Sequence, residues 1–251
     1  MDNLWITKLS LWKTLWKSIE LSTNGGVLRR GNVIFTFLFV LSLCLVNVVG
    51  LVLSVSQANI YYKGNIVIDA GHGGVDGGVS DGNIKESDIT LKIAYNLKDE
   101  LEKDGYKVIL TRHSKDALGE DKKSDMEERK KIINKVNPLI TISVHINKFT
   151  SSNVRGVRVF YDDTKKFKTH GEIMQNTINT MINKKYIGRV DLKAQGGDYF
   201  ITKCSSSPSL IVECGFLSNE NDKKLMLSNS YRIELSKAIT TGVNNIFDNK
   251  T

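Results

Sequence analysis

Residues 66–78 read IVIDAGHGGVDGG, and this stretch sets the pattern that the rest of the chain follows. Its first residues are β-branched and apolar and predict a short buried strand, and the glycines after them predict a tight turn. His72 lies inside that turn. In open α/β sheets, ligands bind just beyond the carboxyl ends of the strands. The stretch therefore indicates a strand of such a sheet, with a histidine at the edge where ligands bind.

Similar short apolar runs alternate with longer amphipathic stretches through the rest of the chain. The runs that predict strands are IVID (66–69), KVILT (107–111), LITISVH (139–145), GVRVFY (156–161), DYFIT (198–202) and SLIVEC (209–214). The stretches that predict helices are 86–105, where apolar residues recur every four positions, 124–136, 165–183 and 229–247. Strands that alternate with helices predict an α/β fold, with a mostly parallel central sheet of about six strands flanked by helices.

The composition is that of a globular protein. The 251 residues are 41% hydrophobic and 25% charged, with 20 glycines and 2 prolines, which excludes collagen-like and wholly disordered chains. Three cysteines are too few for a disulfide framework. The formal net charge is +8, but the basic residues are not clustered with aromatic ones, so we expect no nucleic-acid partner.

An uncharged apolar run occupies residues 33–55, and Arg29 and Arg30 lie just before it. About 20 apolar residues span a bilayer as a helix, so the run predicts an N-terminal transmembrane helix. The two arginines then predict a cytoplasmic N-terminus and an extracytoplasmic chain after about residue 58. The run is longer than the apolar core of most signal peptides, which favours an uncleaved signal anchor over cleavage before Asn59. The predicted division is a basic cytoplasmic segment (1–32), the anchor or signal peptide (33–55) and an exported domain (59–251).

Residues of the types that bind metals lie at the ends of several predicted strands and at one helix start. His72 follows the first strand, Glu86 opens the first helix, His145 ends LITISVH and Glu213 ends the run SLIVE. Two histidines and one carboxylate form a catalytic zinc site that leaves one position open for water. Such a site also needs a second, unliganded glutamate to move protons. The four residues together predict a zinc-dependent hydrolase.

Each of these residues also has an ordinary structural explanation. His72 could be a loop histidine. GHGGVDGG could also be a phosphate-binding loop, although it lacks both the Lys-Ser/Thr ending of a P-loop and the GxGxxG order. Glu86 could stabilise a helix dipole, and His145 could be a hydrogen-bonded core residue. Glu213 is harder to explain in this way, because buried carboxylates are rare unless they are paired or bind a metal. Their common position at the carboxyl edge of one sheet favours the metal site.

Four motifs in order along the chain carry a resemblance to a known family. IVIDAGHGGVDGG, Glu86, SVHIN (143–147) and IVECGFLSN (211–219) together resemble the zinc-dependent N-acetylmuramoyl-L-alanine amidases of bacterial cell walls. The resemblance covers about residues 64–248. RGVRVFY (155–161), GDYFITK (197–203) and the absence of wall-binding repeats are most similar to the sporulation- and germination-specific amidases of spore formers.

The resemblance implies a function and a set of site residues. It implies hydrolysis of the amide bond between N-acetylmuramic acid and L-alanine in peptidoglycan, during spore cortex maturation or germination, by a zinc amidase domain at 59–251. It implies Zn²⁺ as the cofactor, with His72, Glu86 and His145 as the metal ligands and Glu213 as the catalytic glutamate. Asn147 is a candidate for substrate contact. Peptidoglycan is the expected partner, outside the cytoplasm, with contact to the membrane through the N-terminal helix.

Some alternatives stay open at this stage. Another exported zinc hydrolase, such as a peptidoglycan carboxypeptidase or deacetylase, would use the same residues, and a non-catalytic wall-binding protein could keep the fold. Lys148 places a charge near the expected cleft, and Arg112 and Arg129 are interpreted as structural. Cys204 and Cys214 lie on successive predicted strands and could pair. The sequence identifies neither the oligomeric state nor a regulatory protein partner.

Overall fold

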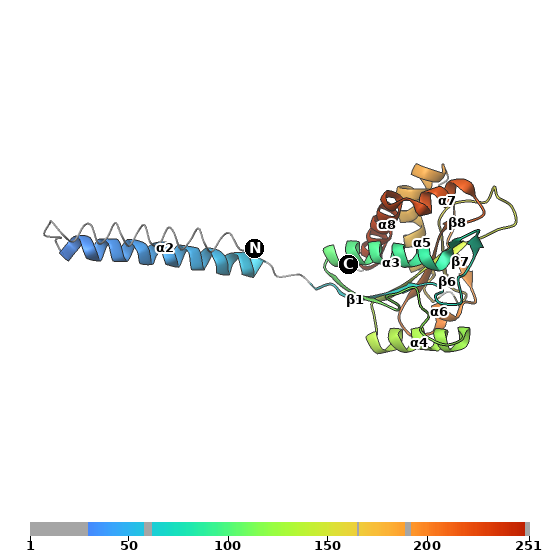
Figure 1. Ribbon diagram of the computed structural model, residues 1–251, viewed down its shortest axis with the longest axis horizontal. Helices are drawn as coiled ribbons and strands as arrows, with labels where there is room; N and C mark the ends of the chain where they lie inside the picture. Colours follow the sequence, from blue (N-terminus) through green and yellow to red (C-terminus); the bar gives the residue numbers. More distant parts are fainter. Residues whose placement is uncertain (1–29, 58–61, 165, 189–191, 249–251) are drawn as a thin grey trace. The chain divides into compact units, whose positions relative to one another are not determined.

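The computed structural model describes residues 30–57, 62–164, 166–188 and 192–248 (Figure 1). The chain divides into two compact units between Ile60 and Tyr61. The first contains helix α2 (Arg30–Gln57), which includes the apolar run 33–55. Within the described residues, no helix combines the length and the apolarity needed to cross a membrane, so the structure gives the predicted transmembrane helix no support. Most of the predicted basic segment 1–32 lies outside the described residues.

The second unit is built on a six-stranded sheet with the order β4-β1-β5-β8-β6-β7. All neighbouring strands are parallel except β6 and β8, which are antiparallel. This confirms the predicted α/β fold. The strands are β1 (Gly64–Ala70), β4 (Tyr106–Leu110), β5 (Ile140–Asn147), β6 (Arg158–Asp162), β7 (Gln195–Gly197) and β8 (Ser209–Phe216). A small hairpin, β2 (Ser80–Asp81) and β3 (Ile84–Lys85), lies outside this sheet.

Helices cover both faces of the sheet (Figure 1). One face carries α3 (Glu86–Lys103), α5 (Lys168–Ile178) and α8 (Asn229–Asp248), and α5 continues into the wider turns of η1 (Asn179–Ile187). The other face carries α4 (Lys122–Val136) and α6 (Phe200–Lys203), and α7 (Glu220–Leu227) follows β8. Successive β1 residues alternate between these layers: Ile66 and Ile68 join the larger core under α3, whereas Val67 joins the smaller core.

The order of the strands creates a crevice at the carboxyl ends of β1 and β5. From β1 the chain crosses to β4 through α3, and then returns through α4 to β5 on the other side of β1. The two connecting helices consequently lie on opposite faces, and the loops after β1 and β5 separate. Such a reversal of strand order is the place where open α/β sheets bind ligands.

The prediction of a strand at 198–202 is wrong. Strand β7 ends at Gly197, and residues 200–203 form the short helix α6. The aromatic and β-branched residues of DYFIT favour a strand locally, but Thr202 closes a helical turn, since its backbone N–H and its hydroxyl both donate to the Tyr199 carbonyl. Cys204 therefore ends a helix rather than lying on a strand, and Cys204 and Cys214 are both free thiols. Helix α7 was not predicted.

Candidate functional site

The loop after β1 holds His72 in a left-handed backbone conformation, with φ at 61°. This conformation is unfavourable for a residue with a side chain, so surrounding contacts have to maintain it. The Asp76 carboxylate lies 2.9 Å from Nδ1 of His72, and Arg129 donates a 2.7 Å hydrogen bond to the His72 carbonyl. The side chain and the backbone of His72 are each held by a charged partner.

Two fully buried arginines support this loop from behind. Arg112 donates to the carbonyls of Ala70 and Gly71 at 2.9 and 3.0 Å. Arg129 donates to the Ala70 carbonyl at 2.8 Å and pairs with Asp69 at 2.7 Å. Buried guanidinium groups are costly unless all their donors are used, and here they bind the backbone carbonyls that lead to His72. The structural interpretation of both arginines agrees with these contacts.

Glu86 begins α3 and is almost completely buried. The backbone N–H groups of Val79 and Ile146 each donate to one of its carboxylate oxygens at 2.9 Å. The other contacts of these oxygens are Nε2 of His72 at 3.3 Å and Nδ1 of His145 at 3.1 Å. Burial raises the pKa of Glu86, but the hydrogen bonds and charges of the two histidines outweigh burial and lower it to about 2. The group is therefore a carboxylate at neutral pH.

His145 lies near the end of β5 and completes this cluster. A register shift between His145 and Asn147 interrupts the regular pairing with β8 near the carboxyl end of β5. The imidazole lies against the backbone of Gly71, where an added Cβ would be only 2.5 Å from Cε1 of the ring. Only glycine at position 71 leaves this space free.

His72, Glu86 and His145 together form a compact set of metal-binding atoms. One ligand atom from each residue lies within 4.8 Å of the other two. The two imidazole rings are 5.1 Å apart and nearly perpendicular, at 80°. Burial lowers the pKa of His72, but the charges and hydrogen bonds of Glu86 and Asp76 raise it overall. Two imidazoles and one carboxylate are the donor set of catalytic zinc sites, so these residues fit a zinc ion.

Glu213 lies on β8, where its backbone is in register with His145 of β5. Its Oε2 atom is buried and has no hydrogen-bond partner among the residues that the structure describes. Burial raises its pKa to about 7, although the two histidines partly oppose this shift. A carboxyl group with a pKa near neutrality can both accept and release a proton.

A cavity of about 440 Å³ opens beside these residues. Its lining includes His72 and His145, Glu213 from β8, and residues of α4 and α6. The remaining lining residues are Asp69, Gly71, Asp76, Lys122, Asp125, Met126, Arg129, Asp198, Tyr199, Phe200, Ile201 and Ile211. The Glu213 carboxyl group thus lies at a cavity that is also lined by two members of the His72–Glu86–His145 cluster, an arrangement that metal-assisted hydrolases use.

Comparison with known proteins identifies the family. The family model described as N-acetylmuramoyl-L-alanine amidase matches residues 66–245, which include the whole sheet except the first residues of β1. The chain belongs to this amidase family. The resemblance inferred from the four motifs is thereby confirmed.

Individual amidases show how far the likeness extends. The germination-specific N-acetylmuramoyl-L-alanine amidase of Bacillus subtilis is 31% identical over 74% of this chain and 80% of its own length. The probable cell wall amidase LytH of Staphylococcus epidermidis is 30% identical over 72% of this chain, which spans 58% of that relative. The CwlD amidase from Clostridioides difficile, solved in complex with the GerS lipoprotein, is 29% identical, with a TM-score of 0.69 over 75% of this chain and all of that one.

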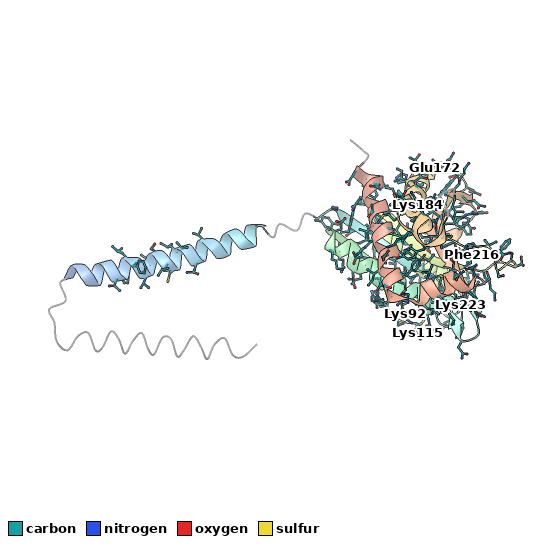
Figure 2. The ribbon with its side chains drawn as sticks, turned by 90° about the horizontal axis from the view of Figure 1, so that it is seen from above. Lys92, Lys115, Glu172, Lys184, Phe216 and Lys223 are labelled. Atoms are coloured by element: carbon teal, nitrogen blue, oxygen red, sulfur yellow. The ribbon has the colours of Figure 1, made fainter. Side chains whose placement is uncertain are left out.

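Asn147 and Lys148, which the sequence places near the expected cleft, both follow His145 in this amidase. Asn147 accepts a hydrogen bond from the Lys148 backbone at 2.8 Å and is not among the described residues that line the cavity. Lys148 instead donates to the Ser80 carbonyl of the β2–β3 hairpin at 2.9 Å. Lys223 of α7, labelled in Figure 2, forms an ion pair with Asp81 of the same hairpin, with Nζ 2.6 Å from the Asp81 carboxylate. Both lysines thus hold the segment that leads to Glu86.

Several residues of the amidase cavity were missed at the sequence level. Asp76 lies four residues after His72 in the same loop, and this spacing does not predict the contact between the Asp76 carboxylate and the His72 ring. Tyr199 and Phe200 were assigned to a strand, so their position at the cavity was not predicted. Lys122 was also missed as a cavity residue. It lies in the first turn of α4, just after the capping residue Asp121, whose side chain accepts a hydrogen bond from the Ser124 backbone.

Proposed function

We propose that this protein hydrolyses the amide bond between the lactyl group of N-acetylmuramic acid and L-alanine in peptidoglycan, with zinc as its cofactor. Family membership supports the reaction, and the His72–Glu86–His145 cluster supports the metal. The single observation that carries the proposal is the position of Glu213 at the cavity that this cluster borders, with a buried Oε2 atom that has no hydrogen-bond partner among the described residues.

The residues divide the work of the reaction between them. His72, oriented by Asp76, would bind the zinc ion together with Glu86 and His145. Bound there, zinc would polarise the scissile carbonyl and lower the pKa of a water molecule. Glu213 would accept the proton of the attacking water and then deliver it to the departing alanine amine. A pKa of about 7 suits a group that performs both transfers.

We assign the protein to spore peptidoglycan because of its likeness to the germination-specific amidase of Bacillus subtilis. Peptidoglycan lies outside the cytoplasm, so we place the action there. The uncharged run 33–55 after Arg29 and Arg30 is the basis for proposing a membrane anchor or export signal. A protein partner is a further proposal, suggested by the lipoprotein in the Clostridioides difficile structure.

Mass spectrometry of peptidoglycan digested by the purified full chain tests the reaction. We expect stem peptides with a free L-alanine amine and glycan strands with an unsubstituted muramic carboxyl group. Loss of only the terminal amino acid would indicate a carboxypeptidase, and loss of acetate would indicate a deacetylase. Binding to peptidoglycan without any product, at full zinc occupancy, would indicate a wall-binding protein and contradict the proposal.

A further inference from the structure

One side of the cavity is aromatic. Tyr199, Phe200 and Ile201, at the start of α6, line the same cavity as His145 and Glu213. Tyr199 is 40% exposed and Phe200 is 42% exposed, although both are large and lie beside a buried core. Exposed aromatic surface in a cavity is characteristic of a binding surface, because leaving it in water is unfavourable until a ligand covers it.

The ring of Tyr199 is fixed in place by its neighbours. It packs edge-to-face on Phe160, with ring centroids 5.5 Å apart at 71°. It also lies directly over Gly197, where an added Cβ would be 2.1 Å from Cε2 of the ring. Burial raises the pKa of Tyr199, and the nearby charge of Glu213 raises it further. The aromatic surface is thus preformed and close to the proton-exchanging carboxyl group.

A lysine also lines the cavity, beside the carboxylates of Asp76 and Asp125. Lys122, in the first turn of α4, lines the cavity, and its charge lowers the pKa of Asp76. Lys130 of the same helix lies over the Phe200 ring, 5.7 Å from its centroid. Eight helical residues span about 12 Å. Phe200 therefore lies beside a turn of α4 that is about 12 Å along the helix from Lys122.

We propose that Tyr199 and Phe200 bind the pyranose ring of the muramoyl half of the substrate, and that the stem peptide extends toward Lys122. This inference rests on the proposed amide hydrolysis. The muramoyl half is uncharged, and its ring lies only a few bonds from the scissile carbonyl, within reach of a surface next to Glu213. The C–H face of a pyranose packs well on aromatic rings. The stem peptide carries carboxylates, which complement Lys122.

Two substrates with the same scissile amide test this assignment. The purified full chain is given an N-acetylmuramoyl peptide and the matching N-lactoyl peptide, which lacks the sugar ring. We expect wild-type kcat/KM to favour the muramoyl peptide by about tenfold or more, as one aromatic contact surface would provide. Tyr199→Ala should abolish most of this preference, chiefly through KM, whereas Tyr199→Phe, which keeps the ring, should retain it. Tyr95→Ala, which removes a 39% exposed tyrosine of α3, is the matched control.

The outcomes separate this inference from the proposed function. If wild-type protein hydrolyses neither amide, the proposed function is wrong, and the inference falls with it. If wild-type protein hydrolyses both equally well, or Tyr199→Ala loses the same factor on both, amide hydrolysis stands and the sugar-binding role is overturned. Tyr199→Leu keeps an apolar side chain over Gly197 and replaces the alanine variant if that variant does not fold. The preference of Tyr199→Leu for the muramoyl peptide over the lactoyl peptide should also fall, because leucine lacks the aromatic ring.

Discussion

Glu213 of β8 lies in register with His145 of the neighbouring parallel strand β5. Residues in register on adjacent parallel strands lie about 4.8 Å apart and point to the same face of the sheet. The group proposed to move protons and a proposed zinc ligand are therefore held side by side on two central strands. Rigid elements of this kind keep catalytic groups in place better than loops do.

Replacing Glu213 with glutamine should abolish most amide hydrolysis while leaving the fold and the metal site intact. The amide of glutamine can form a hydrogen bond with water but cannot accept its proton. A general acid–base group contributes about 10²–10⁴-fold to the rate, so we expect turnover to fall by that factor. Turnover, zinc content and melting temperature should be measured on one preparation.

The matched control is Glu220→Gln, which removes an exposed carboxylate from the first turn of α7. It should retain wild-type turnover. If Glu213 is only a structural residue, the glutamine variant will melt at a lower temperature, and its remaining folded fraction will stay active. That result would refute the catalytic role.

His72→Ala and His145→Ala should each lose bound zinc. Each substitution leaves two of the three proposed ligands, and two ligands rarely retain a catalytic zinc ion. Elemental analysis of purified protein should find about one zinc per chain in wild type and almost none in either variant. His113→Ala is the control, since its side chain is exposed and lies outside the cluster. Full zinc occupancy in both cluster variants would contradict the ligand assignment.

Gly71→Ala should weaken the metal site without changing any ligand. The added Cβ would lie 2.5 Å from the His145 ring, so the imidazole would have to move away from Glu86 and His72. Because metal sites tolerate only small displacements, zinc affinity should fall by about 10–100-fold. Competition with a chelator measures this affinity. Gly196→Ala is the matched control, because its Cβ would be no closer than 3.4 Å to any atom. An unchanged affinity in Gly71→Ala would show that the ring can shift without cost.

The central strands were predictable because their side chains are buried on both faces. The runs that became β1 and β8 contain continuous apolar stretches, which indicates the middle of a parallel sheet, and β5 alternates apolar residues with polar ones such as Thr141 and Ser143. His72, His145 and Glu213 follow from the same pattern, since they lie near or just beyond the carboxyl ends of those strands, whereas Glu86 begins α3. The hydrogen-bonding partners of Glu86 could not be predicted, because Val79 and Ile146 contribute backbone groups, which carry no residue signature.

The aromatic side of the cavity could not be predicted for a different reason. Tyr199 and Phe200 belong to the residue types that favour strands, and a run of four such residues (199–202) gives no sign of its environment. Tertiary contacts decide the outcome here: Ile201 enters the smaller core, whereas the two aromatic rings remain half-exposed at the cavity. The missed contact between His72 and Asp76 likewise depends on a loop conformation that propensities do not describe.

The predicted anchor can be tested by cell fractionation. If residues 33–55 hold the protein in the membrane, the full chain should sediment with membranes and resist extraction by salt and alkali. A charged substitution such as Leu43→Arg, near the centre of the run, should weaken insertion, because an arginine there costs about 3 kcal/mol. Leu227→Arg, at an exposed position of α7, is the control. Recovery of wild-type protein in the soluble fraction with Asn59 at its N-terminus would show a cleaved signal instead.

Acid should destabilise the protein through Asp69, the buried carboxylate near the end of β1, just before the loop that contains His72. Burial alone would raise the pKa of Asp69, but the Arg129 charge and the hydroxyls of Ser143 and Thr111 lower it below its ordinary value. A lowered pKa means that the native state prefers the charged carboxylate. This contribution to stability is complete above the unfolded pKa of about 3.9 and is lost as the pH falls through the native value. The melting temperature of wild type should therefore drop steeply below about pH 4.

Asp69→Asn should melt lower at pH 7, because it leaves Arg129 buried without its charge partner, a change that costs about 3–5 kcal/mol. The difference between the two proteins should then shrink toward pH 3. A constant difference across this range would show that Asp69 does not titrate as inferred.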